Sequence, residues 1–196
     1  MARQGIRMRD SVKTGLIIKP SFREVAKLGG FFEIIGRRAG RTVVGGHYHG
    51  PEHLFRDVCK NLVTSVGLTY ITGAGLLGVA ADSTWFVGLA DANPAFAAGD
   101  TLASHAGWTE ATEYDEVNRQ AWTGVAGAAG AASNSSSPSV FTINATISVE
   151  GAFIASVNTG TSGTLLCEAP MAVQRDLIDN DVITVIYNWG AADDGV

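Results

Sequence analysis

The stretch Val140–Val149 alternates between apolar and polar side chains over ten residues. Phe141, Ile143 and Ile147 fall on one side of it, and polar residues stand between them. Successive side chains of a β-strand point to opposite faces of a sheet, so this period of two predicts a half-buried strand. The apolar face of such a strand needs a core to cover, which makes a β-sheet protein the first expectation.

Further short apolar runs predict more strands. Thr84–Leu89 and Leu165–Cys167 are bounded by turn residues, as the strands of sandwiches are. Val182–Trp189 is apolar on most of both faces, which indicates a central strand. These runs, with 24 glycines and frequent turns, predict a mainly-β fold, namely an antiparallel β-sandwich, of which a jelly roll is one form.

One short helix is predicted near residues 51–64. A proline and a glutamate at its start suit the first helical turn, and Leu54, Val58 and Leu62 follow at a spacing of four. We expect this helix to pack its apolar stripe over one face of a sheet. The glycine- and alanine-rich residues 73–81 are expected to form a loop.

We expect a different structure for each of two connections in the chain. Phe31–Ile35 and Arg41–Val44 predict a β-hairpin that turns at residues 38–40. The connection Asp91–Gln120 is long, and a loop of that length is usually functional or anchored. We expect it to be ordered by an aspartate that caps a turn and by three rings that pack on the sheet. These loop anchors are Asp100, His105, Trp108 and Trp122.

The charge distribution divides the chain into an arm and a body. Residues 1–42 hold ten basic and three acidic side chains, a net charge of +7, which leaves −12 for the remainder of a chain whose total is −5. Such asymmetry suits nucleic acid or an acidic protein surface. The basic segment lacks interleaved aromatic rings, which favours the protein surface over nucleic acid. An ordinary solvated pair of strands with scattered basic side chains remains the alternative.

We therefore expect residues 1–28 to form an extended basic arm and residues 29–196 to form the β-sandwich body. The arm would attach to a partner through its charges and its apolar anchors. The candidate partner-binding residues are Arg3, Arg7, Arg9, Lys13, Leu16, Ile17, Ile18 and Phe22.

The motifs of common enzymes are missing from the sequence. Ser104 and His105 are neighbours without a nucleophile elbow, whereas catalytic triads are assembled from distant segments. His47, His49 and His53 match no defensible zinc spacing, and the acidic run at residues 110–116 lacks the order of a calcium loop. We expect no catalytic residues, no metal and no cofactor.

The cysteines and the hydropathy of the sequence indicate the state of the thiols and whether the chain spans a membrane. Cys59 and Cys167 lie far apart in sequence and outside any CxxC motif, which favours two buried thiols, with a disulfide as the alternative. Eighteen consecutive apolar residues occur nowhere, so we expect no membrane span.

Several segments of the sequence are similar to a family of small virion-associated structural proteins of tailed bacteriophages. The aspartate–serine–histidine–tryptophan run inside residues 98–110 is the most specific part, and the similarity covers about residues 29–190. The other segments are residues 61–68, Trp85–Leu89, Tyr114, Asn118–Trp122, Phe141–Thr146 and Gly151–Phe153.

The resemblance implies a particle component without catalytic residues, made in the host cytoplasm and located in the virion. Within that class we expect a capsid decoration, or cement, protein that binds the major capsid protein or another virion protein and also its own copies, for example as a trimer. A tail, neck or fibre-base component is the alternative. A carbohydrate-binding module is an alternative of another class, with Trp108, Tyr114 and Trp122 as its candidate rings.

Overall fold

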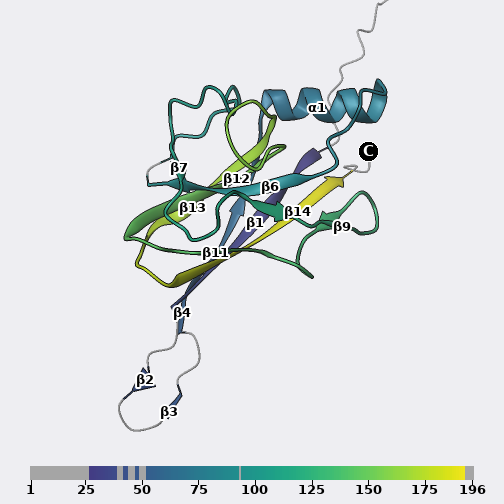
Figure 1. Ribbon diagram of the computed structural model, residues 1–196. Helices are drawn as coiled ribbons and strands as arrows, with labels where there is room; N and C mark the ends of the chain where they lie inside the picture. The colour runs from purple at the N-terminus through teal and green to yellow at the C-terminus, as the bar shows by residue number, and fades with distance from the viewer. Residues whose placement is uncertain (1–26, 39–41, 44–46, 49–51, 93, 193–196) are drawn as a thin grey trace, which may run out of the picture.

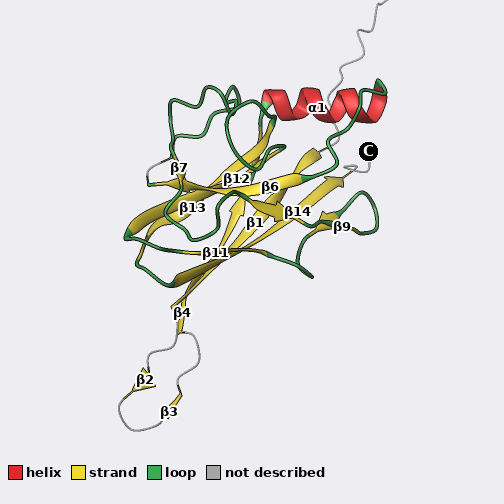
Figure 2. Cartoon of the chain, in the orientation of Figure 1, coloured by secondary structure: helices red, strands yellow, loops and turns green. Residues whose placement is uncertain are grey.

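The computed structural model describes residues 27–38, 42–43, 47–48, 52–92 and 94–192. They form two antiparallel sheets packed together, and the described part contains one helix (Figures 1 and 2). The predicted mainly-β class and sandwich architecture are therefore confirmed. Of the residues 1–28 expected to form the attachment arm, 1–26 lie outside the described residues, and Lys27 and Leu28 begin strand β1.

The first sheet is built around β14, which pairs with β1 over twelve residues, from Lys27 opposite Ala192 to Arg38 opposite Asp181. The predicted central position of the last strand is confirmed, because β14 also pairs with two short strands on its other side. In spatial order the sheet contains β4 (Glu52–Lys60), β1 (Lys27–Arg38), β14 (Asp181–Ala192), β10 (Ala132–Ser133) and β9 (Val125–Ala126), and β11 (Ser139–Thr142) pairs with β14.

The second sheet is built around β12 and β13, which pair with each other and with strands on both sides. Two breaks of register interrupt the β12–β13 ladder, near Gly151 and near Ala155. In spatial order the sheet contains β5 (Leu62–Val63), β13 (Leu165–Leu177), β12 (Ile147–Ala155), β6 (Trp85–Asp91) and β7 (Glu110–Ala111), and β8 (Gln120–Trp122) pairs with β6.

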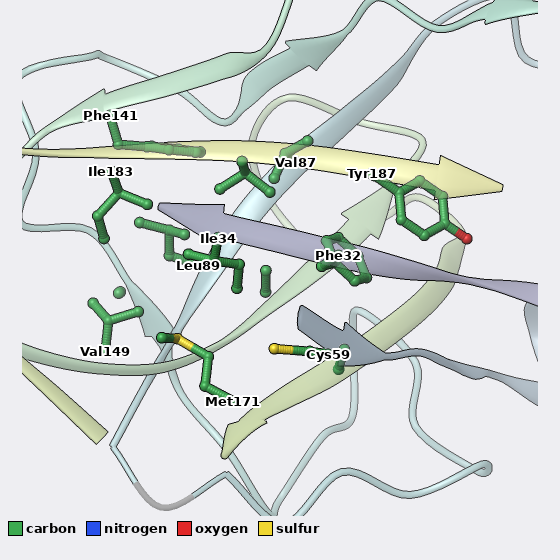
Figure 3. Close-up of a cluster of buried hydrophobic side chains, with 14 of the residues drawn as sticks. Phe32, Ile34, Cys59, Val87, Leu89, Phe141, Val149, Met171, Ile183 and Tyr187 are labelled. Carbon is green, nitrogen blue, oxygen red and sulfur yellow. The ribbon is translucent and has the colours of Figure 1, made fainter. Parts of the chain in front are cut away.

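The main hydrophobic core lies between the two sheets (Figure 3). Phe32 of β1 and Tyr187 of β14 stack with ring centroids 4.5 Å apart. Burial of one such large side chain stabilises the fold by about 1.5–3 kcal/mol. Other members of this core from the two sheets include Ile34, Cys59, Phe141, Ile183, Val87, Leu89, Val149 and Met171.

The expected helix near residues 51–64 is wrong, because most of this segment is strand β4. It pairs with β1 along nearly its whole length and turns Phe55 and Cys59 into the core. The ring of Phe55 occupies the space where Gly36 of β1 has no side chain. Val58, part of the supposed helical stripe, is exposed. The ladder offered by β1 outweighs an apolar spacing that also suits a helix.

The helix is α1 (Ser65–Leu76), which includes residues expected to be a loop. Thr64 caps its start, since the Thr64 hydroxyl accepts a hydrogen bond from the Gly67 amide at 3.0 Å. The Thr64 hydroxyl also donates to the carbonyl of Leu165 in β13, so the cap fixes the helix to the second sheet. A cap and a docking site outweigh the low helix propensity of the glycines in the last turns.

The segment Val140–Val149 is two strands rather than one. β11 belongs to the first sheet and β12 to the second, and residues 143–146 cross between them. The predicted burial of Phe141 and Ile143 is confirmed, and Ile147 is partly buried. The alternation of buried and exposed side chains continues across residues 143–146 because both sheets face the same core.

The expected hairpin between residues 31–35 and residues 41–44 is also wrong. β1 continues to Arg38 and pairs with β4, whereas β2 (Thr42–Val43) pairs with β3 (His47–Tyr48). β4 supplies eight residue pairs and buried side chains, which two residues of β2 cannot match. The hairpin is therefore the longer one between β1 and β4, and β2 and β3 lie within its connection (Figure 1).

Candidate functional site

The long connection between β6 and β8 covers the outer face of the second sheet. Phe153 and Ile154 are neighbours in β12 but belong to different clusters, so the sheet carries a second, smaller core on its outer face. Leu102 and Trp108 of the connection are buried in this second core, and Trp108 is 7% exposed. The connection is thus packed onto the sheet by its own apolar side chains.

Three of the four expected loop anchors meet here. The Trp108 indole N–H donates to the Asp100 carboxylate at 3.1 Å, and the Ala97 amide donates to the same oxygen. The ring of His105 stacks on Trp108 at 3.9 Å, and its Nδ1 lies 3.0 Å from the Trp108 carbonyl oxygen. Every one of these contacts holds the loop together, which is the arrangement of a packed loop rather than of a triad.

The side chains of the acidic run 110–116 form internal contacts instead of a cation site. Glu110 is paired with Arg119 at 2.6 Å, and Glu116 accepts a hydrogen bond from the Thr142 amide at 2.9 Å. Across the described residues, no three histidine, cysteine, aspartate or glutamate side chains are grouped to hold a metal ion. Of the three histidines considered for metal binding, only His53 has a described side chain, and it is exposed on β4.

The fourth expected anchor, Trp122, lies apart from the other three, in a cavity at the end of the sandwich. Its indole N–H donates to the Tyr187 carbonyl at 3.2 Å. The cavity has a volume of about 280 Å³ and lies between α1 and the ends of both sheets. Its walls are nearly all apolar: Tyr70, Ile71, Ala74, Trp85, Trp122, Ile154, Leu166, Tyr187 and Trp189.

Helix α1 covers this cavity with one side and leaves much apolar surface uncovered. No charged residue occurs between Asn61 and Ala81. Leu76 and Leu77 at the end of the helix are 81% and 74% exposed, and Val79 just after it is also exposed. Ser65, Thr69 and Thr72 of the helix are also exposed and are polar but uncharged, so this surface, α1 with residues 77–79, combines exposed apolar side chains with a complete lack of charge. We call it the α1 surface.

Two edges of the sheets, by contrast, carry features that discourage pairing with another chain. The edge strand β4 presents Arg56 and Lys60 to solvent. The exposed second half of β13 contains Pro170 and Asp176. Charged side chains and proline are common protections of edge strands. This arrangement makes the α1 surface a better candidate than either of these two edges for contact with other protein.

Glu168 of β13 is the least expected group in the second core. Its side chain is fully buried, and neither carboxylate oxygen has a hydrogen-bond partner of good geometry. Burial, followed by repulsion from the nearby Asp100 carboxylate, raises the pKa of Glu168 to about 8. The Ala97 amide and the Trp108 indole lie near enough to oppose that rise. The carboxyl group is therefore largely protonated at neutral pH.

Sequence patterns pointed to Asp100 and Trp108 but missed Glu168 and the α1 surface. One charged residue inside the apolar run Leu165–Ala169 was the available signal for a buried carboxyl group. The uncharged stretch from Asn61 to Ala81 was the signal for the surface. Trp108 and Tyr114 are buried, so two of the three rings considered for sugar binding are not exposed.

In the described part of the chain, α1 is too short to cross a membrane. No protein-family model matches the chain, and no curated protein matches it either.

Proposed function

We propose that this protein is a structural component of a tailed-phage virion, a capsid decoration protein that stabilises the shell by contacts with its neighbours. The observation that carries the proposal is the α1 surface, where Leu76, Leu77 and Val79 are exposed on a stretch without charge. Exposed apolar side chains grouped in this way mark protein contact sites. An assembly subunit has such a surface because a neighbour covers it.

The sequence supports the same class of function in two other ways. The resemblance to virion-associated proteins extends over most of the chain, and the basic segment 1–42 carries a net charge of +7 against −12 for the remainder. Charge of this kind steers a subunit onto an acidic partner, whereas buried apolar anchors supply affinity. The partners we propose are the major capsid protein, or another virion protein, and further copies of this chain.

A double variant, Leu76→Ser with Leu77→Ser, tests the role of the α1 surface. Both side chains are exposed, so the variant should fold with an almost unchanged melting temperature. Its incorporation into particles should fall sharply in a reconstitution with undecorated shells. Val117→Ser is the matched control, because Val117 is 94% exposed and lies outside this surface. Equal incorporation of the double variant and the control would refute the proposed contact.

Two further measurements separate the alternatives. Densitometry of purified particles should give many copies relative to the major shell protein, whereas a low ratio would assign the protein to the tail, neck or fibre base. Truncation of residues 1–26 should leave a folded body, since β1 begins at Lys27, and should weaken incorporation. Undiminished incorporation of the truncated chain would remove the arm from the mechanism.

A further inference from the structure

The fully buried carboxyl group of Glu168 lies beneath the loop that covers the second sheet, and the half-buried Asp100 carboxylate of that loop lies nearby. Glu168 belongs to β13, and Asp100 belongs to the connection between β6 and β8. Asp100 already accepts hydrogen bonds from the Ala97 amide and the Trp108 indole, both within the loop. The Asp100 carboxylate is therefore part of the loop's own framework, while Glu168 is fixed in the sheet beneath it.

A fully buried carboxylate with no hydrogen-bond partner cannot be ionised without a large cost, and the negative charge of the nearby Asp100 adds to that cost. A proton on Glu168 removes the repulsion between the two negative charges. The protonated carboxyl group can also donate a hydrogen bond to the Asp100 carboxylate. The same proton satisfies a buried group that otherwise has no partner. We propose that Glu168 is a proton-operated clamp, which holds the 95–109 loop on the second sheet when protonated and releases it when ionised.

Beyond the Ala97 amide and the Trp108 indole, which already donate to Asp100, the described groups around Glu168 do not offer its negative charge a partner. Leu62 of β5 and Phe153 of β12, the cross-strand neighbours of Glu168, are uncharged. Arg119 lies over the Phe153 ring at 5.3 Å but is bound to Glu110 by two hydrogen bonds. Ionised Glu168 is thus expected to reach water, and water reaches it only when the loop lifts.

Two more titratable side chains are near enough to be considered. His105 stacks on Trp108, so its ring belongs to the same loop. Cys167 precedes Glu168, and burial, in part opposed by hydrogen bonds, raises the pKa of this thiol to about 12. Cys167 therefore stays neutral over the range in which the clamp would act, and His105 needs a control.

The sign of the effect follows from proton linkage. The closed loop holds the Glu168 proton up to a pH of about 8, whereas an open loop releases it near the ordinary value of about 4.5. The open state therefore becomes more populated as the pH rises between these values, by up to about tenfold per pH unit, and levels off above them. When the loop opens, the proton passes to solvent.

Hydrogen–deuterium exchange of the full chain between pH 5 and 9 tests the clamp. Protection of peptides from residues 95–109, corrected for the intrinsic exchange rate, should fall with rising pH in the wild type. In Glu168→Gln, which mimics the protonated acid, protection should be high and independent of pH. Peptides of β14 serve as the internal reference, and Glu113→Gln, an exposed acid, should behave as the wild type. His105→Gln should retain the slope.

Three results would overturn the proposal. The first is loop protection in the wild type that does not change with pH, and the second is the same fall in the Glu168→Gln variant. The third needs no variant: a carboxyl resonance of Glu168 in the wild type that titrates near the ordinary glutamate value. A titration near 8 supports the clamp even if the glutamine variant fails to fold.

Discussion

Arg119 and Glu110 form a two-pronged ion pair within the long connection, with N–O distances of 2.7 and 2.6 Å. The Arg119 side chain is almost fully buried and also donates to the carbonyls of Val157 and Gly160. One guanidinium therefore joins β7 and the C-terminal end of the connection to the turn between β12 and β13. A fork of fixed geometry suits this task better than the single charge of a lysine.

Removal of Arg119 should destabilise the protein strongly. Arg119→Ala leaves Glu110 and two carbonyls without their donor, and loss of one partner of a buried ion pair costs about 3 kcal/mol or more. Urea unfolding measures the change. Arg56→Ala is the matched control, because the Arg56–Glu33 pair is exposed, and it should change the midpoint little. Similar losses in both variants would contradict the structural role of Arg119.

Substitution at the sheet crossing should distinguish the buried from the exposed face. Ile143 is 1% exposed, so Ile143→Asp places an unpaired charge in the main core and should abolish soluble folding. Thr146→Asp, three residues away on the exposed side, should be tolerated. The soluble yield and the circular dichroism spectrum of the two variants are the measurements. A well-folded Ile143→Asp variant would show that the register across the crossing differs from the one described.

Asp181 should stabilise the protein at neutral pH and less so in acid. Burial disfavours its charged form, but hydrogen bonds from Arg38 and the Ile178 amide prevail and lower its pKa. This stability is present above the unfolded value, near 3.9, and is lost as the pH falls through the folded value. Asp181→Asn should therefore cost about 2 kcal/mol at pH 7 and less at pH 3, measured by urea unfolding. Asp179→Asn, an exposed neighbour, should show no such trend.

Both cysteines should be unreactive in the folded protein and free after unfolding. Burial, followed by the nearby Asp57 charge, raises the pKa of Cys59 to about 12, and burial raises the pKa of Cys167 to about 12. A thiol reagent at pH 8 should modify neither cysteine in the native chain, because the reactive thiolate form is scarce and the sulfur atoms are buried. In urea the reagent should modify two thiols per chain, since both cysteines are free in the structure. If no thiol is modified in urea, the two cysteines form a disulfide.

The local sequence pattern was sufficient to predict which side chains of a strand face the core. The alternation at Val140–Val149 placed Phe141 and Ile143 in the core, and the continuous apolar run at Val182–Trp189 indicated the central strand. These features depend on the two-residue repeat of an extended chain, which holds whatever the strand pairs with. The same reasoning could not find the switch of sheets within Val140–Val149, because both sheets face one core.

Only tertiary contacts decided which alternative each ambiguous segment adopted. The spacing of Leu54, Val58 and Leu62 fits a helix, but pairing with β1 makes most of this segment a strand. Thr64 marks the true helix start, and its hydroxyl needs the Leu165 carbonyl of a strand a hundred residues away. Choices of this kind are made by long-range partners, which a local repeat does not identify.

The meeting of Asp100 with Glu168 has the same origin. The sequence marked Asp100 as a residue that holds a loop, and it showed one acid within the apolar run of β13. Whether that acid faces solvent or a second carboxyl group depends on how the loop folds back over the sheet. The sequence by itself determined the apolar faces of several strands, because these faces follow from short-range periodicity. The tertiary structure decided the burial of Glu168 beneath the loop and the uncovered α1 surface, because both depend on which distant segments cover each other.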